Sequence, residues 1–214
     1  MFTGIVQNSV SVAEIIKKPG LITFSLIFPD ELRVGLQAGA SVAVDGVCFT
    51  TLKVEHNQVF FDAMQETLQL TTIGLLTTGQ LVNVERSFKI GDEVGGHLLS
   101  GHIYGMAEIT AIDTSIPNNQ VITFKVPHHL TKYIFSKGFV ALNGVSLTIV
   151  DVDKQNATFT VYFIPETLKR TTFGSKQVGD WVNIEIDSQT QAIVETVERI
   201  LAEKDLSNTI SKKN

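Results

Sequence analysis

A cysteine and a serine occupy equivalent positions in two copies of one short motif. The motif reads Gly46-Val47-Cys48-Phe49-Thr50 in the first half of the chain and Gly144-Val145-Ser146-Leu147-Thr148 in the second. Another aligned pair sets Ile5 against His102. A histidine has a pKa near neutrality, so beside a hydroxyl group it is suited to general acid–base catalysis. The diverged positions therefore predict a proton-transfer site built on His102 and Ser146, with Cys48 as a weaker candidate.

These residues taken alone leave a structural role open. Ser146 can simply end a turn, His102 can be a core side chain with its hydrogen bonds satisfied, and a lone buried cysteine usually behaves as a small hydrophobic residue. A Cys-His hydrolase made from Cys48 and His102 is not supported, because nothing orients the histidine and no helix N-terminus is indicated for the thiol.

Other motifs favour neither a metal site nor a nucleotide site. The segment 91–97 is rich in glycine but lacks the Gly-Lys-Ser/Thr of a phosphate-binding loop and the strand–helix–strand context of a dinucleotide fingerprint, so it is interpreted as a loop. His97 and His102 are five residues apart, which places them on opposite faces of a strand, and one cysteine excludes a CxxC zinc site. We expect no bound metal.

The chain contains one unit twice, and this repeat defines the elements that must position the motifs. Residues 62–86 align with 162–186 without a gap, and both segments carry Glu-Thr-Leu, at 66–68 and 166–168. Residues 41–54 align with 139–152, and Thr3-Gly4-Ile5-Val6 aligns with Ser100-Gly101-His102-Ile103. A period of about a hundred residues is too long for a solenoid unit and indicates duplication of a whole domain.

Within each half the apolar residues alternate with period two, which predicts strands. Residues 22–28 correspond to 121–126, and further runs at 41–44, 48–54, 58–62 and 81–85 are separated by turn pairs such as Asp45-Gly46 and Asn143-Gly144. Short strands with no long helical segment between them favour closed antiparallel barrels. The fold class is therefore all-β, with two similar barrels.

The C-terminal region follows a helical pattern instead. Ser188 and Gln191 predict a capping box, Glu195 and Arg199 an i,i+4 pair, and the apolar residues at 193, 194, 197, 200 and 201 form one stripe. This stripe can pack on its own barrel or against copies of itself. The predicted organisation is a barrel at 1–86, a connector at 87–97, a barrel at 98–187, a helix at 188–206 and a disordered tail at 207–214.

Composition excludes several classes of protein. The 17 Lys and Arg against 22 Asp and Glu give a net charge of −5 with no basic cluster, so a nucleic-acid partner is not expected. The start of the chain lacks a signal peptide, and no apolar run is long enough to span a membrane. The single cysteine fits a reducing compartment, so we expect a cytoplasmic protein without a membrane partner.

Several independent motifs together resemble the riboflavin synthase family (its alpha chain). They are Met-Phe-Thr-Gly-Ile-Val at the start, Gly-Gly-His-Leu-Leu-Ser-Gly-His at 95–102, the repeated Gly-x-Cys/Ser-x-Thr and Glu-Thr-Leu, and Val-Asn-Ile-Glu-Ile-Asp at 182–187. The resemblance implies two six-stranded Greek-key barrels, each binding one 6,7-dimethyl-8-ribityllumazine. It implies dismutation of two such molecules by transfer of a four-carbon unit, giving riboflavin and 5-amino-6-ribitylaminouracil without a cofactor.

The resemblance also assigns site residues. It makes His102 and Ser146 the pair that assists deprotonation in the C-terminal pocket, and Cys48 a nucleophile or hydrogen-bonding group in the N-terminal pocket. Further positions that match family substrate-binding residues in the first barrel are Phe2, Gly4, Ile5, Val6, Ser41, Phe49, Thr50, Asp62, Ala63, Met64, Gln65, Glu66 and Thr67. Those in the second barrel are Gly101, Ile103, Lys137, Leu147, Thr148, Tyr162, Phe163, Ile164, Pro165, Glu166 and Thr167.

The family pattern implies an assembly as well. It is a homotrimer with the active site between subunits, which favours an interface role for the helical stripe. Val47 stands where some members carry a second cysteine, so a Cys-Cys pair is not required. The competing hypothesis is a non-catalytic lumazine- or flavin-binding antenna protein. Such a carrier needs one site, whereas both halves here keep the repeated motifs.

Overall fold

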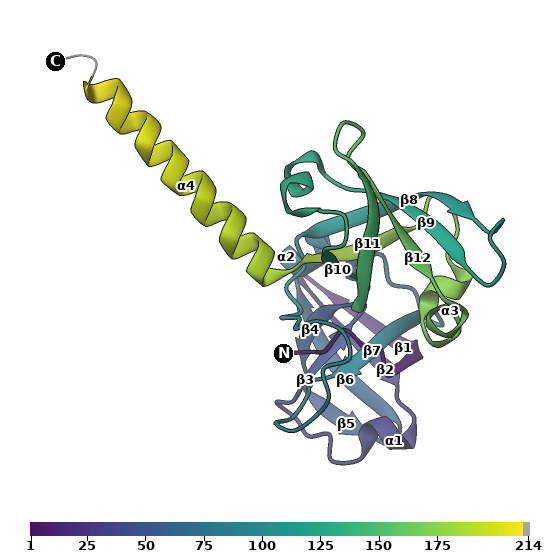
Figure 1. Cartoon of the computed structure of the whole chain (residues 1–214). Helices are drawn as coiled ribbons and strands as arrows, with labels where there is room; N and C mark the ends of the chain where they lie inside the picture. The colour runs from purple at the N-terminus through teal and green to yellow at the C-terminus, as the bar shows by residue number, and fades with distance from the viewer. Residues whose placement is uncertain (212–214) are drawn as a thin grey trace.

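The computed structural model describes residues 1–211, with side chains described as far as Lys204, and consists of two β-rich halves and one long helix (Figure 1). The elements of the first half are β1 (Asn8–Lys18), β2 (Leu21–Ile27), α1 (Asp30–Arg33), β3 (Ser41–Val44), β4 (Val47–Thr50), β5 (Lys53–Glu55), β6 (Gln58–Met64), α2 (Gln65–Leu70), the 3-10 helix η1 (Thr72–Leu75) and β7 (Leu81–Arg86). Those of the second half are β8 (Gly105–Asp113), β9 (Gln120–Lys125), η2 (His128–Tyr133), β10 (Phe139–Leu142), β11 (Val145–Asp153), β12 (Thr158–Phe163), α3 (Pro165–Arg170), η3 (Thr172–Ser175) and β13 (Trp181–Ile186), followed by α4 (Ser188–Ser211).

The two halves differ at one strand. The second half is a closed antiparallel barrel with the order β10-β11-β12-β9-β8-β13, whereas the first is a seven-stranded sheet with the order β4-β3-β7-β1-β2-β6-β5. Its two end strands, β4 and β5, are consecutive in the chain and together correspond to β11. Between them, the Thr51 N–H donates to the Ala40 carbonyl and the Leu52 N–H to the Phe60 carbonyl. The segment between β4 and β5 thus connects the two ends of the sheet. The prediction of two all-β units is confirmed.

Two tight turns bring the halves together. Asp45-Gly46 joins β3 to β4, Asn143-Gly144 joins β10 to β11, and all four residues have positive φ, as a two-residue hairpin turn requires. A Cβ atom on Gly46 would lie 2.7 Å from the Gly144 amide nitrogen. Only glycine permits this approach, so the predicted turn pairs also form the contact between the two halves.

Asparagine side chains bond reciprocally across this contact. The Asn83 side chain donates to the Asn143 carbonyl, and the Asn183 side chain donates to the Asp45 carbonyl. Their oxygens accept the Thr172 and Thr72 amides of the opposite half. All these asparagines are buried, so their polar atoms need such partners. The hydrogen bonds therefore fix the two halves in one relative orientation.

Each half has its own apolar core, but the loop segment that precedes each half packs on the core of the other half. These two loops are called the exchanged segments. Val6 packs in the core of the second half, and Ile103 packs against the core of the first. The Ser146 N–H donates to the Gly4 carbonyl, and the Cys48 N–H donates to the Gly101 carbonyl. The segment before each half therefore completes the opposite half.

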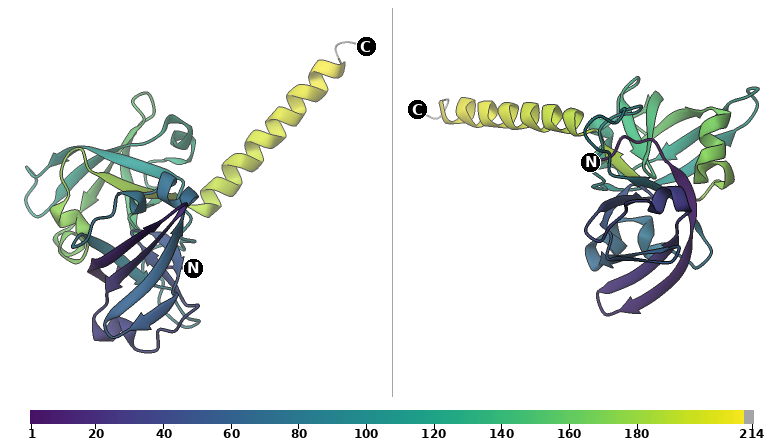
Figure 2. Two further views of the ribbon diagram at one scale, coloured as in Figure 1. Left: turned by 180° about the vertical axis from the view of Figure 1, so that it is seen from behind. Right: turned by 90° about the horizontal axis from the view of Figure 1, so that it is seen from below.

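Helix α4 projects away from the two halves (Figures 1 and 2). Asp187 caps it, because its carboxylate accepts the Thr190 N–H and Oγ1–H, so the predicted capping box of Ser188 and Gln191 is wrong. Glu195 accepts hydrogen bonds from Tyr133 and Gln191 in place of the predicted pair with Arg199. These contacts attach only the first part of the helix to the second half.

The helix is longer than predicted. It continues beyond residue 206 to Ser211, since no glycine or proline occurs after Ser188 to end it, so the disordered tail predicted from residue 207 is wrong for 207–211. Residues 212–214 of that tail lie outside the described residues. Within the described part of the chain, no helix has the length and apolar character needed to cross a membrane.

Candidate active site

Two equivalent pockets lie where the exchanged segments meet the barrels. The first, the Cys48 pocket, has a volume of about 240 Å³ and is lined by Val47, Cys48, Glu66, Thr67, Leu70, Thr71, Gly101, His102 and Ile103. The second, the Ser146 pocket, has a volume of about 340 Å³ and is lined by Gly4, Ile5, Val6, Val145, Ser146, Glu166, Thr167, Arg170 and Thr171. Equivalent positions of the repeat line both, so the duplication has produced two similar concave sites.

A buried carboxylate holds each exchanged segment. Glu85 accepts hydrogen bonds from the Thr3 hydroxyl at 2.7 Å and from the Gly4 amide, and Glu185 accepts them from the Ser100 hydroxyl at 2.7 Å and from the Gly101 amide. Burial raises the pKa of both carboxyl groups, and these hydrogen bonds oppose the rise. The last strand of each half thus orients a loop that lines the other half's pocket.

The Cys48 pocket combines a thiol with an imidazole. His102 is exposed in the pocket wall, and its backbone N–H donates to the Ser100 hydroxyl. Burial raises the pKa of the Cys48 thiol, a rise that the Ser41 hydroxyl and the N-terminal ammonium group oppose. A raised pKa keeps this cysteine a neutral thiol near pH 7, which is the opposite of an activated nucleophile.

The Ser146 pocket contains a different pair. The Ser146 Oγ lies 2.6 Å from the Nδ1 of His97, whose ring stacks on Phe139 with centroids 5.0 Å apart. His97 is buried, and burial lowers the pKa of its imidazole against the opposing effect of Asp187. Its side chain is therefore a neutral hydrogen-bond partner of Ser146 near pH 7.

The structure separates the predicted catalytic pair. His102 lies beside Cys48, and Ser146 lies in the other pocket, so the prediction that the two form a pair in the C-terminal pocket is wrong. The predicted assignment of Gly4-Ile5-Val6 to the first barrel and of Gly101-His102-Ile103 to the second is wrong for the same reason. The physical cause is the exchange of the two segments, which Glu85 and Glu185 hold across the contact.

His97 contacts Ser146, although the sequence patterns indicate no role for it in this pocket. His97 lies outside the segments that align between the two copies. A comparison of the two copies therefore cannot single it out. The sequence feature that marks His97 is the pair of glycines before it. A Cβ atom on Gly96 would lie 2.5 Å from the Ser146 Cβ, so this loop packs directly against the serine.

The other predicted binding residues lie in different environments. Phe49, Ala63, Leu147 and Phe163 have buried side chains, so they can offer only backbone atoms to a ligand. Phe2 is buried between the halves and forms a β-bridge with Leu99, where it packs with Ala43 and Ala141. The Asp62 carboxylate accepts a hydrogen bond from the Thr23 hydroxyl, and Lys137 occupies a positive-φ turn before β10.

The remaining predicted residues are at least partly accessible. The partly exposed ones are Ser41, Thr67 and Thr167, which is the counterpart of Thr67. The exposed ones are Thr50, Met64, Gln65, Glu66, Thr148, Tyr162, Ile164, Pro165 and Glu166. Most of these lie on the strand ends and short helices at the two pockets, where side chains can reach a ligand.

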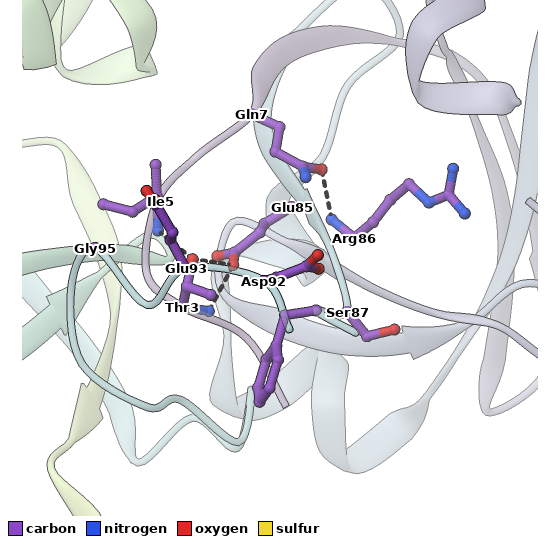
Figure 3. A pocket seen from close by; sticks show the side chains of 10 residues that line it. Thr3, Ile5, Gln7, Glu85, Arg86, Ser87, Asp92, Glu93 and Gly95 are labelled. Atoms are coloured by element: carbon purple, nitrogen blue, oxygen red, sulfur yellow. Dashed lines mark hydrogen bonds between the residues drawn. The ribbon is translucent and has the colours of Figure 1, made fainter. Parts of the chain in front are cut away.

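A third cavity of about 660 Å³ borders the Ser146 pocket and shares Ile5 with it (Figure 3). The connector forms one wall with Asp92, Glu93 and Gly95, and Figure 3 shows the Glu85 carboxylate directed at Thr3 on the other side. Within the residues whose side chains are described, no group of histidine, cysteine and acidic side chains is arranged to hold a metal ion.

Comparison with known proteins agrees with this duplicated architecture. The family model described as the lumazine binding domain matches residues 3–87 and 100–187, one match for each half. The chain is 50% identical to the riboflavin synthase of Escherichia coli K12 over 96% of this chain and 95% of that protein. It is 44% identical to the riboflavin synthase of Chlamydia pneumoniae over 94% of this chain and 98% of that protein.

The chain belongs to the riboflavin synthase family. Solved structures related to this family carry ligands. LumP complexed with riboflavin matches with a TM-score of 0.81 at 26% identity, over 88% of this chain and 100% of that one. LumP complexed with 6,7-dimethyl-8-(1'-D-ribityl) lumazine matches with a TM-score of 0.79 over the same shares. The resemblance to the riboflavin synthase family is thereby confirmed.

Proposed function

We propose that this chain is a riboflavin synthase that dismutates two molecules of 6,7-dimethyl-8-ribityllumazine. One molecule transfers a four-carbon unit to the other, and the products are riboflavin and 5-amino-6-ribitylaminouracil. The observation that carries the proposal is the presence of two equivalent pockets, each complete with its repeated motifs. A reaction between two like molecules needs two like sites, and holding both rings in place removes most of the entropic cost of their encounter.

The complete active site consists of pockets from two copies of the chain. In one chain, α2 and α3, which carry the Glu-Thr residues of the two pockets, lie on opposite sides of the body (Figure 1). One chain therefore cannot bring its two bound substrates into contact. The Cys48 pocket of one copy faces the Ser146 pocket of another in the assembly we propose.

Helix α4 supports an assembly of this kind, which we take to be a homotrimer. Its residues Ile193, Val197, Ile200 and Leu201 are between 44% and 65% exposed on a helix that projects from the body. An exposed apolar stripe of this length is typical of an interface between helices. Val194 packs partly against the second core, so the stripe divides between its own barrel and neighbouring copies.

The two pockets divide the chemistry. Proton removal from the lumazine C7 methyl group requires a base, and His102 is the accessible imidazole in the Cys48 pocket. Ser146 of the facing copy offers a hydroxyl to the second ring, so the predicted pair of His102 and Ser146 meets between copies. Cys48 contributes a neutral hydrogen-bonding group. Other matched residues, Thr50 and Thr148 among them, shape the two pockets. We also propose that the protein is located in the cytoplasm.

A direct assay tests the proposal. Purified protein is incubated with 6,7-dimethyl-8-ribityllumazine while flavin absorbance is followed, and the uracil product is quantified in parallel. Equal amounts of riboflavin and 5-amino-6-ribitylaminouracil are expected, with half of the lumazine recovered in each. A stable lumazine complex without conversion would instead identify an antenna-type binding protein, which is the competing function that the ligand-bound LumP structures support.

A further inference from the structure

Ser146 and Cys48 both have a backbone and a side-chain hydrogen-bond partner, but only Ser146 has an imidazole as its side-chain partner. Its backbone N–H donates to the Gly4 carbonyl at 2.9 Å, and its Oγ lies 2.6 Å from the His97 Nδ1. A serine hydroxyl otherwise rotates freely and can be either a donor or an acceptor. The contact with His97 restricts that freedom, because the hydroxyl hydrogen cannot point toward Nδ1 if that nitrogen is itself the donor.

The His97 ring is itself held rigidly. It is 8% exposed and lies nearly parallel to the Phe139 ring, with an interplanar angle of 20°. Gly96 allows the loop to approach, because a Cβ atom there would lie within 2.5 Å of both the Ser146 Cβ and the Thr3 carbonyl oxygen. Stacking and loop packing thus set the direction from which Nδ1 meets the serine.

The surroundings of the second ring nitrogen select the tautomer. The His97 Nε2 is buried and has no hydrogen-bond partner among the residues that the structure describes. A proton on Nε2 would leave a buried N–H donor unsatisfied, which proteins avoid more strictly than an unsatisfied acceptor. The neutral ring with its proton on Nδ1 leaves only a lone pair unpaired, so Nδ1–H is the donor to the Ser146 Oγ.

We propose that His97 is the positioning residue of the Ser146 pocket: it donates from Nδ1 to Ser146, which directs the serine hydroxyl hydrogen into the pocket as a donor to the bound ring. The inference rests on the proposed function for its catalytic consequence. In the other pocket the Cys48 thiol meets the Ser41 hydroxyl, at the position equivalent to Phe139, and not a stacked imidazole. The two substrates therefore meet different hydrogen-bonding groups at matched positions.

A matched pair of amide variants isolates the Nδ1 donor. The side-chain amide of asparagine occupies the place of Nδ1, and that of glutamine the place of Nε2. We expect His97→Asn to keep kcat within about threefold, whereas His97→Gln lowers kcat about tenfold, the size of one net hydrogen bond, with KM and the Kd for riboflavin within about threefold. His129→Gln, on the exposed face of η2, is the control.

Equal activity of the two His97 variants would overturn the proposal, whether both are active or both are not. A second measurement is independent of turnover: the ¹⁵N NMR signals of labelled histidine report which nitrogen carries the proton. We expect Nδ1 of His97 to be protonated and its signal to shift in Ser146→Ala. A proton on Nε2, or an Nδ1 signal insensitive to that substitution, would overturn the proposal. If the unchanged chain formed no riboflavin, the proposed function would fail while this spectrum still tested the contact.

Discussion

The Cys48 pocket and the Ser146 pocket descend from one ancestral site and now differ at several matched positions, three of which bear on the chemistry. Cys48 stands against Ser146, Ser41 against Phe139, and His102 against Ile5. One pocket presents an accessible imidazole beside a neutral thiol, and the other a hydroxyl held by a buried imidazole. Under the proposed function this difference assigns the pockets different roles: one substrate loses a proton, and the other is attacked by the resulting carbanion.

The largest effect is expected from the accessible imidazole. His102→Gln removes the base of the Cys48 pocket while keeping a polar side chain, so kcat should fall on the order of 100-fold or more, the usual contribution of general acid–base catalysis. Riboflavin affinity, measured by fluorescence quenching, should stay within about threefold because backbone groups form much of the pocket. A loss of affinity without a loss of kcat would show that His102 only holds substrate.

A smaller loss is expected from the hydroxyl of the other pocket. Ser146→Ala keeps the backbone hydrogen bond to Gly4 and removes only the oriented donor, so kcat should fall about 10-fold to 100-fold. Single-turnover rates with saturating lumazine check this. Loss of binding alone would argue that the serine recognises substrate without assisting the reaction.

The contact between the halves contains two equivalent turn residues whose contributions to the stability of the fold can be compared. Asp45 and Asn143 occupy equivalent turns, and each side chain accepts a backbone N–H, from Asn83 and Asn183 respectively. Burial raises the pKa of Asp45 to about 7, against a value near 3.9 in an unfolded chain. Neutral Asp45 therefore stabilises the fold fully below about pH 4, and this stabilisation is lost as pH rises through 7.

Asp45→Asn should remove that pH dependence. At about 1.4 kcal/mol per pKa unit the wild-type loss is at most on the order of 4 kcal/mol, so the variant should unfold at higher urea concentration than the unchanged chain at pH 8 and at a similar one at pH 4. Asn143 occupies the equivalent turn and accepts the equivalent hydrogen bond, so an asparagine side chain should fit at position 45. Identical pH dependence of the two urea midpoints would contradict this account of the contact.

The smallest effect is expected from the thiol. Cys48→Ser places the hydroxyl of one pocket in the other, and because burial keeps the thiol neutral, kcat should change by less than about threefold. Steady-state assays with lumazine check this. A loss of 100-fold would instead assign Cys48 a covalent role and remove the distinction drawn between the pockets.

Much of the fold follows from local pattern in the sequence, since period-two strands and the Asp-Gly and Asn-Gly turns depend only on neighbouring residues. Duplication then identifies the repeated pocket positions. The exchange of the segments around Gly4 and Gly101 depends on contacts with Glu85 and Glu185, which are more than eighty residues away in the chain. No local pattern specifies such pairing, so position along the chain alone assigns each of these segments to the wrong pocket.

The interruption between β4 and β5 has the same kind of cause. The corresponding strand β11 has a shift of register between Ile149 and Val152, at the position where the first half breaks at Thr51 and Leu52. The sequence predicts one strand over 48–54 because the apolar pattern continues through the break. Whether a bulge or a break forms there depends on the curvature that barrel closure requires, which is a property of the whole sheet.

Complementation between two impaired variants tests the central claim most directly: that His102 and Ser146 act from pockets of different copies. His102→Gln and Ser146→Ala chains are unfolded together, refolded as a mixture and assayed for riboflavin formation. With head-to-tail sites between copies, about a quarter of the sites regain both side chains, so activity should rise well above that of either variant alone. No gain in activity in verified mixed oligomers would place both residues in one chain's site and contradict the account.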